Sequence, residues 1–203
     1  MNPIIKKLIE ANIEHIENNE FGLVYERALS LNMKVDIGEL TDIFYDAGID
    51  PLAHLEYVPP LFLDESRITA LSIPENIKVI YKSGCAFSKL EHIELHNDCE
   101  ISDNAFMNSN IKKIIIPYIM NEVPEECFYG CKQLSDVDLN AVEQIGSEAF
   151  YGCTNLTKLF IPDDIVYIAD TAFAGCPVVL HFHSDNEYAI DYCQQTRREY
   201  QFV

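Results

Sequence analysis

A phenylalanine recurs at nearly constant spacing between residues 87 and 173, and this period constrains the fold more than any other feature of the chain. Successive members are 19, 22, 22 and 23 residues apart, and they are Phe87, Phe106, Phe128, Phe150 and Phe173. Alanine or cysteine precedes each of them, and in the last three copies glycine and cysteine follow two and three residues later. A period near 22 residues predicts an array of stacked repeats, not a single globular core.

Pairs of apolar residues separated by one residue recur with the same period. They are Leu71/Ile73, Ile93/Leu95, Ile114/Ile116, Val137/Leu139, Leu159/Ile161 and Leu180/Phe182. This spacing predicts short strands, because residues i and i+2 of a strand point to one face and the residue between them points to the other. A single strand cannot bury its apolar face alone, so each repeat must stack on the next and share its core.

Two units, LTKLFIPDDIVYIADTAFAGC and LSDVDLNAVEQIGSEAFYGC, resemble the BspA-type (Treponema pallidum-type) leucine-rich repeats. The resemblance covers about two thirds of the chain. It is strongest in the last three units, whereas residues 88–89 and 107–110 replace the Gly-Cys stretch in the first two. It implies an α+β fold in which about five or six repeats of about 22 residues form a leucine-rich-repeat solenoid of short parallel strands.

Residues 1–60 differ from the repeats in composition and predict a helical domain. Apolar residues at helical spacing indicate one helix from Pro3 through Ile16 and a second over residues 20–31. The first turn of a solenoid exposes an open core and a strand edge, so capping it is a sufficient role for this domain. The repeats are then expected over residues 61–183.

Two further helices are predicted before the repeats begin. The first of these starts after Asp36, which forms a capping-box pattern with Glu39, and ends before Gly48. Asp50 and Pro51 predict the start of a short helix that ends near residue 57.

A second cap is predicted over residues 184–203. Ser184 and Glu187 form a capping-box pattern before an amphipathic stretch, which indicates a helix. The resemblance to BspA-type arrays implies such a C-terminal helical cap, and a last strand near residues 200–203 would close the stack.

The formal net charge of −19 limits the partners that the chain can bind. An acidic protein repels the phosphate backbone, so direct binding to nucleic acid is not expected. The charge favours a basic protein partner, or mimicry of a nucleic acid towards a protein that binds one.

No membrane contact is expected, and we predict a cytoplasmic location. Acidic residues at positions 10, 14 and 17 interrupt the N-terminal apolar residues, so no secretory signal is predicted. The longest apolar run, residues 114–120, contains proline and is far shorter than the ~20 residues that span a bilayer. Surface adhesins are common among proteins with BspA-type repeats, so the resemblance alone does not fix the location.

The seven cysteines are predicted to be reduced and buried. Cys131, Cys153 and Cys176 hold the same position in successive repeats, so they form a column with a spacing of about 4.8 Å. That spacing is compatible with disulfide geometry. The odd number of cysteines and their recurrence at one repeat position nevertheless favour reduced cysteines that form a column of small buried side chains.

The sequence contains no known catalytic or cofactor-binding motif, so we predict no catalytic residue, no cofactor and no enzyme activity. His181 and His183 lie at strand spacing with Asp185 nearby, which suggests a weak metal site. Solvent-exposed surface residues are the preferred interpretation of these side chains. A metal-dependent enzyme is therefore only an alternative.

The residues between the paired apolar positions should form one outward row. They are Ser72, Glu94, Ile115, Asp138, Phe160 and His181. Two of them, Ile115 and Phe160, are large and apolar where the repeat predicts contact with solvent. Together with Tyr118 and Ile119, and bordered by Glu94 and Asp138, they predict a partner-binding surface with a polar rim. The alternative is that the helical domain or a second copy of the chain covers them, so self-association is possible.

The repeat architecture favours a non-enzymatic module that binds a protein partner through the face of the solenoid. Small BspA-like proteins of phages and low-GC bacteria are similar in plan. That resemblance implies a narrower alternative, in which a phage or mobile-element inhibitor sequesters a host defence protein, acting as an acidic mimic.

Overall fold

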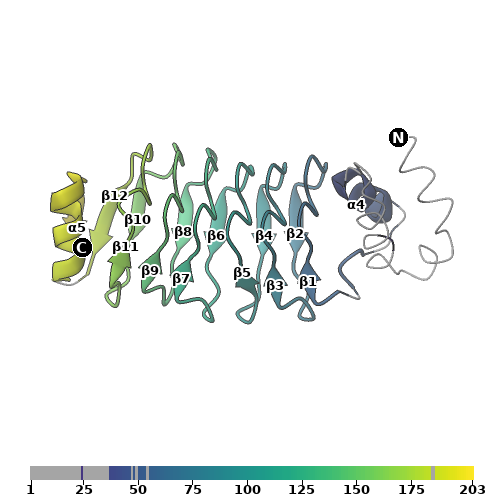
Figure 1. Cartoon of the computed structure of the whole chain (residues 1–203), viewed down its shortest axis with the longest axis horizontal. Coiled ribbons are helices and arrows are strands. Elements are labelled where there is room, and N and C mark those ends of the chain that lie inside the picture. The colour runs from purple at the N-terminus through teal and green to yellow at the C-terminus, as the bar shows by residue number, and fades with distance from the viewer. Residues whose placement is uncertain (1–23, 25–36, 47, 49, 54, 184–185) are drawn as a thin grey trace.

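The computed structural model describes residues 24, 37–46, 48, 50–53, 55–183 and 186–203. These residues form a straight β-solenoid with one helix at each end (Figure 1). The helices predicted over residues 3–16 and 20–31 lie outside the described residues, apart from Val24. The predicted division of the chain at residues 60 and 183 stays a prediction.

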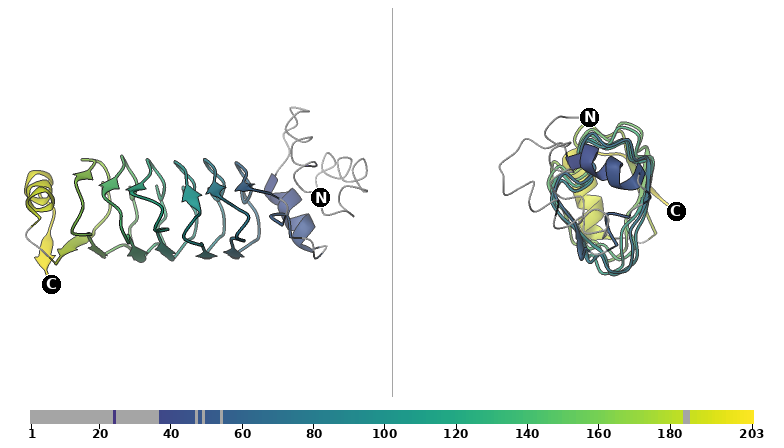
Figure 2. Two further views of the ribbon diagram at one scale, coloured as in Figure 1. Left: turned by 90° about the horizontal axis from the view of Figure 1, so that it is seen from below. Right: turned by 90° about the vertical axis from the view of Figure 1, so that its right-hand side faces the viewer.

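Each turn of the solenoid contributes one strand to each of two walls. The first wall contains β1 (Tyr57–Val58), β3 (Val79–Ile80), β5 (Glu100–Ile101), β7 (Glu122–Val123), β9 (Gln144–Ile145) and β11 (Tyr167–Ile168). The second, which we call the strand face, contains β2 (Ala70–Ser72), β4 (His92–Glu94), β6 (Lys113–Ile115), β8 (Asp136–Asp138), β10 (Lys158–Phe160) and β12 (Val179–Phe182). All paired strands are parallel. The right-hand view of Figure 2 looks along the solenoid and shows successive turns superposed as one closed outline.

The apolar pairs point inward from the strand face, as the i and i+2 spacing predicts. In β2, β6, β8 and β10 the middle residue of the strand, which is the first member of the apolar pair, is buried. The residues on either side of it are exposed. The second member of the pair, such as Ile116 or Ile161, is buried just after the strand ends. In β4 the pair Ile93 and Leu95 is only half-buried.

The phenylalanines stack along the core between the two walls. Phe106, Phe128, Phe150 and Phe173 are fully buried, and the centroids of neighbouring rings are 5.4–5.5 Å apart with interplanar angles of 9–13°. Offset-stacked rings at this separation add to the free energy gained by burying them. The period seen in the sequence is therefore the spacing of one aromatic stack.

Phe87 does not belong to this stack, so its assignment from the sequence was wrong. In three of the stacked residues, Phe106, Phe128 and Phe150, the backbone N–H donates to a carbonyl of the next turn, as Phe106 does to Cys127. In the preceding turn the equivalent donor is Cys85, which bonds to the carbonyl of Ala105. The core position therefore passes from Cys85 to Phe106, a step of 21 residues, and the apparent 19-residue step does not exist.

Phe87 occupies the position that glycine holds in later turns. Its φ is 52°, and the equivalent residues are Asn108, Gly130, Gly152 and Gly175, with φ of 54°, 68°, 66° and 70°. A left-handed backbone favours glycine because it has no Cβ. The Phe87 side chain is 50% exposed, so it does not fill the core, and its burial does not offset the free-energy cost of the left-handed backbone.

The cysteine column is buried and reduced, as predicted, and it continues into a column of serines. The Sγ of Cys131 donates to the carbonyl of Phe106 at 3.0 Å, and the Sγ of Cys153 donates to that of Phe128 at 3.1 Å. One turn before Cys131 the equivalent residue is Ser109, whose Oγ lies 3.5 Å from the Cys131 Sγ. The column therefore consists of small side chains whose polar atoms find partners inside the core.

We expect the cysteines to be unreactive in the folded protein. All seven are free and buried, and burial raises the pKa of Cys131 and of Cys176 to about 11. The thiolate, which is the reactive form, is therefore scarce at pH 8. Ellman's reagent should modify essentially none of the seven in buffer and all of them in denaturant. Rapid modification of a cysteine in the folded chain would contradict this packing.

Helix α4 (Ile37–Asp46) covers the first turn of the solenoid. Its bounds match the helix predicted from the capping box before Gly48. The Thr41 Oγ1 donates to the carbonyl of Phe62 at 2.8 Å, and Asp42 accepts from the Oγ of Ser66 at 2.6 Å. A Cβ on Gly38 would lie 1.8 Å from a backbone oxygen of the first turn, so the close approach requires glycine here.

The short helix predicted from Asp50 and Pro51 is not formed by the described residues of this segment, which are 50–53 and 55–57. Residues 51–53 form a turn, and the backbone N–H of Leu52 donates to the Asp50 Oδ1 at 2.9 Å. An aspartate that bonds two residues ahead stabilises an Asx-turn as readily as a helix start. The chain then enters β1, which is the first strand of the solenoid.

Helix α5 (Glu187–Thr196) and β13 (Tyr200–Phe202) close the other end. The N-cap is Asn186, whose side chain accepts from the N–H of Ala189 at 2.9 Å. The Asn186 Nδ2 also donates to the carbonyls of Asp163 and Ile165 in the last turn. Strand β13 extends the strand face by pairing with β12.

Arg198 takes the place of a further turn at this end. Its guanidinium donates to the carbonyls of Phe173, Cys176 and Val178 at 2.9–3.3 Å and lies 5.2 Å from the centre of the Phe173 ring. One side chain therefore satisfies carbonyls that the next turn would otherwise bond, and it covers the last ring of the stack.

Candidate functional site

The outward row predicted from the sequence lies along the strand face. Ile115 is in register with Asp138, and Phe160 is in register with His181. The side chains of Ile115 and Phe160 are 50% and 43% exposed. Tyr118 and Ile119, in the turn after β6, are also exposed. The face therefore presents large apolar side chains on a frame of short paired strands.

His181 is the exception in this row, because it is only 7% exposed where solvent exposure was expected. The reason is β13, which was not part of the outward row predicted from the sequence. Gln201 of β13 pairs in register with His181 on one side. On the other side the Phe160 ring lies 5.4 Å from the imidazole. Burial lowers the pKa of His181, and the charge of Lys158 lowers it further.

The histidines do not form a metal site in the part of the chain that the structure describes. His183 is stacked on Phe160, with ring centres 5.7 Å apart, so the two histidines both contact this ring. No group of three or more potential ligands lies together among the described residues. Asp185, the third residue of the predicted site, lies outside them.

Charged residues of opposite sign alternate along the strand face. Glu94 is on β4, Lys113 on β6, Asp136 and Asp138 on β8, and Lys158 on β10. The Lys113 Nζ lies 2.8 Å from the Asp136 Oδ2, and the Lys158 Nζ lies 4.4 Å from the centre of the Phe160 ring. These five residues sum to −1, although the whole chain carries −19. The strand face is therefore close to neutral.

A hollow of about 470 Å³ opens between β4 and β6. The N–H of Ile116 donates to the carbonyl of Asp138, which joins β6 to β8, but the described residues contain no equivalent bond from Leu95 to β6. The separated strands expose core side chains, which explains why Ile93 and Leu95 are only half-buried. The lining residues are His92, Ile93, Glu94, Leu95, Asn97, Lys113, Ile114 and Ile115.

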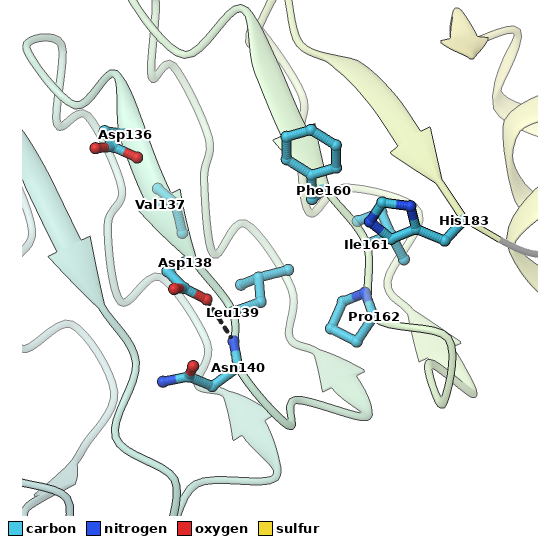
Figure 3. A pocket seen from close by; sticks show the side chains of 9 residues that line it. All are labelled: Asp136, Val137, Asp138, Leu139, Asn140, Phe160, Ile161, Pro162 and His183. Carbon is cyan, nitrogen blue, oxygen red and sulfur yellow. Dashed lines mark hydrogen bonds between the residues drawn. The ribbon is translucent and has the colours of Figure 1, made fainter. Parts of the chain in front are cut away.

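A second hollow, of about 320 Å³, opens between β8 and β10, which also lack ladder bonds to each other (Figure 3). Carboxylates of Asp136 and Asp138 lie on one side, and the Phe160 and His183 rings lie next to each other on the other. The Asp138 Oδ1 accepts from the N–H of Asn140 at 3.0 Å, so this carboxylate leans along its own strand. Neither hollow was predicted from the sequence, because each depends on which neighbouring strands complete their ladder of hydrogen bonds.

The first wall is also interrupted once, between β5 and β7. On either side of this gap, the backbone N–H of Ser102 donates to the carbonyl of Ile80, and the backbone N–H of Gly146 donates to the carbonyl of Val123. The equivalent donor between them is Pro124, which has no N–H.

With this geometry in view, comparison with known proteins decides the family. The family model for the BspA type leucine-rich repeat region matches residues 58–180 with six copies. The chain belongs to the BspA-type leucine-rich-repeat family. No curated protein matches it significantly.

Solved structures of leucine-rich-repeat proteins share the BspA-type fold of this chain. A leucine-rich cell surface protein from Faecalibacterium prausnitzii has 24% identity and a TM-score of 0.58, with 62% of this chain and 35% of that chain covered. A leucine-rich repeat protein from Bacteroides ovatus has 25% identity and a TM-score of 0.53, with 73% and 46% covered. The pneumococcal vaccine antigen PcpA has 24% identity and a TM-score of 0.53, with 65% and 35% covered. The chain spans less than half the length of each of them.

The similarity to these structures concerns the fold of the solenoid alone. Leucine-rich repeats generally present an extended surface to a protein partner. Among the described residues, no helix is both long enough and apolar enough to span a bilayer. The match to a cell surface protein leaves the predicted cytoplasmic location as a prediction.

Proposed function

We propose that this BspA-type chain is a non-enzymatic protein-binding module whose strand face is the contact surface. The observation that carries the proposal is the exposure of Ile115 and Phe160 at positions where the other strands carry polar side chains. Burying an apolar side chain of this size contributes about 1.5–3 kcal/mol, so a few such residues can provide most of the affinity of an interface.

The neighbouring side chains fit the rim of such an interface. Glu94 accepts from the Ser72 Oγ at 3.3 Å, and Lys113 forms its ion pair with Asp136. Both interactions are exposed to solvent, as is usual at the polar edge of a contact surface. Tyr118 and Ile119 extend the apolar area beyond the end of β6.

The charge distribution separates two parts of the surface that the sequence could not distinguish. The strand face is nearly neutral, so it fits a partner with apolar side chains and balanced charge. A basic or nucleic-acid-binding partner, as the net charge alone predicts, would be attracted by the remaining surface. An inhibitor of a host defence protein is one instance of such a module and would use the same strand-face residues.

The double substitution Ile115→Asp and Phe160→Asp tests this function. We expect it to abolish capture of a protein partner from lysate of the native host while the circular dichroism spectrum stays unchanged, because both side chains are exposed. The matched control is Val166→Asp with Tyr167→Asp, which changes two exposed apolar residues of the first wall by the same charge. The control should bind like the unmodified chain.

Two results would reject the strand face as the contact surface. One is partner capture by the folded double variant at the level of the control. The other is loss of capture in the first-wall control alone, which would move the interface to the opposite wall.

A further inference from the structure

The order of charges along the strand face gives this surface a property beyond exposure, because the signs alternate from strand to strand. From β4 to β10 they run negative, positive, negative and positive. A uniformly basic or acidic partner would meet repulsion on every second strand. A partner with the same alternation, shifted by one strand, would meet attraction on all of them.

We propose that a second copy of this chain occupies the strand face, related to the first by a twofold axis that runs along the strands between β6 and β8. The proposal rests on the proposed function, since it names the partner of the same surface. A twofold axis in this place exchanges β6 with β8 and β4 with β10 of the partner. β6 thus faces β8, with Lys113 over Asp136, and β4 faces β10, with Glu94 and Lys158 at opposite ends of the facing strands.

The central contact of this arrangement follows from the strand register. Lys113 and Asp136 are opposite each other on β6 and β8 and already form an ion pair at 2.8 Å. The twofold axis places the Lys113 of each chain over the Asp136 of the other. Two ion pairs then become a square of four charges with alternating sign, in which each lysine has two carboxylate neighbours.

The two hollows are also related by this axis, because one lies one strand spacing before the β6–β8 pair and the other lies one after it. Phe160 would face β4 of the other copy, next to the hollow lined by Ile93 and Leu95. Ile115 would face β8, next to the hollow lined by Leu139. Each exposed apolar side chain therefore has an opening on the other copy within a few ångströms.

The carboxylates that would face these apolar side chains are turned aside. Glu94 is directed towards β2, where its carboxylate accepts from Ser72, and Asp138 is directed along its strand to the N–H of Asn140. Both residues line the hollow beside them. Each carboxylate keeps one hydrogen bond within its own chain when Phe160 or Ile115 of the other copy lies against it.

The size of the face sets the strength of this dimer. Its six strands extend over ~24 Å at a strand spacing of about 4.8 Å, and because most of them are only three residues long, the face is smaller than most specific interfaces. The two copies also repel each other over long range, because each carries −19. We therefore expect a weak dimer that is promoted by moderate salt, whereas binding to a basic partner would weaken as salt is added.

Sedimentation velocity of the full chain, from low micromolar to near-millimolar concentration, tests the proposal. We expect a reversible monomer–dimer equilibrium. Lys113→Glu should raise the dissociation constant by roughly tenfold, because each substituted residue then faces Asp136 of the other copy. Asp136→Lys should have a similar effect. Lys132→Glu, which makes the same charge change as the first variant on an exposed residue away from the strand face, should leave the equilibrium within about twofold.

The decisive arm is an equimolar mixture of the Lys113→Glu and Asp136→Lys chains. The axis places every acidic substitution over a basic one, so the mixture should form a heterodimer about as strong as the original dimer. A chain that stays monomeric at every concentration, or a mixture that does not associate, would overturn the proposal. In either case a loss of partner capture by the Ile115 and Phe160 double variant would still support the proposed function, so the two ideas fail separately.

Discussion

Phe128→Ala is expected to lower the free energy of unfolding by about 3–5 kcal/mol, which is the usual cost of removing a fully buried aromatic ring. Phe128 lies between Phe106 and Phe150, at ring distances of 5.5 and 5.4 Å, so its removal interrupts the stack on both sides. Denaturation by urea, followed by circular dichroism, measures the change. In a solenoid each turn contacts only its neighbours, so the transition should also become less cooperative.

Phe87→Ala is the matched control, because the same ring is removed from a residue that is 50% exposed. We expect a change within about 0.5 kcal/mol, as for other surface substitutions. Phe87→Gly should even stabilise the chain by about 1 kcal/mol, since a left-handed backbone costs about 1–2 kcal/mol in a residue with a Cβ. Equal losses for Phe87→Ala and Phe128→Ala would restore the five-membered series and contradict the structure.

The contrast between these two phenylalanines shows what a repeat pattern can predict. The period, the inward apolar pairs and the cysteine ladder all follow from residue types that recur, so they were correctly predicted. Phe87 was misplaced because it stands two residues after the core position, which Cys85 fills in that turn. A small residue before a phenylalanine is common to both registers, and only the backbone hydrogen bonds distinguish them.

The candidate site also has one part that could be predicted from the sequence and another that could not. The exposure of Ile115 and Phe160 could be predicted, because alternation within a strand is a local property. The burial of His181 was not predicted: a last strand was expected near residues 200–203, but not that β13 would pair with β12 beside His181. The hollows depend on which neighbouring strands complete their ladders, and this is a property of pairs of turns. No single turn contains the information.

The side-chain contacts that dock helix α4 on the first turn were not predicted from the sequence, although the helix and a capping role for this part of the chain were. Asp42 on this helix is buried, and its carboxylate accepts from the Ser66 Oγ, the Arg67 backbone N–H and the Arg67 Nε at 2.6–3.1 Å. The partners lie 24 and 25 residues away, in the first turn of the solenoid. Such pairing depends on the tertiary arrangement and has no local signature.

Asp42→Ala is therefore expected to destabilise the chain by about 1–3 kcal/mol, because it leaves the buried Ser66 hydroxyl and the partly buried Arg67 backbone N–H without an acceptor. Asp46→Ala is the control: it removes a carboxylate from the same helix that also bonds Arg67, at 2.7 Å, but whose side chain is 68% exposed. Exposed ion pairs contribute little, so the control should cost less than about 1 kcal/mol. Hydrogen exchange should locate the Asp42→Ala effect in the first turns, since an uncapped solenoid opens from its end. Equal and small losses in both variants would mean that α4 lies beside the first turn without stabilising it.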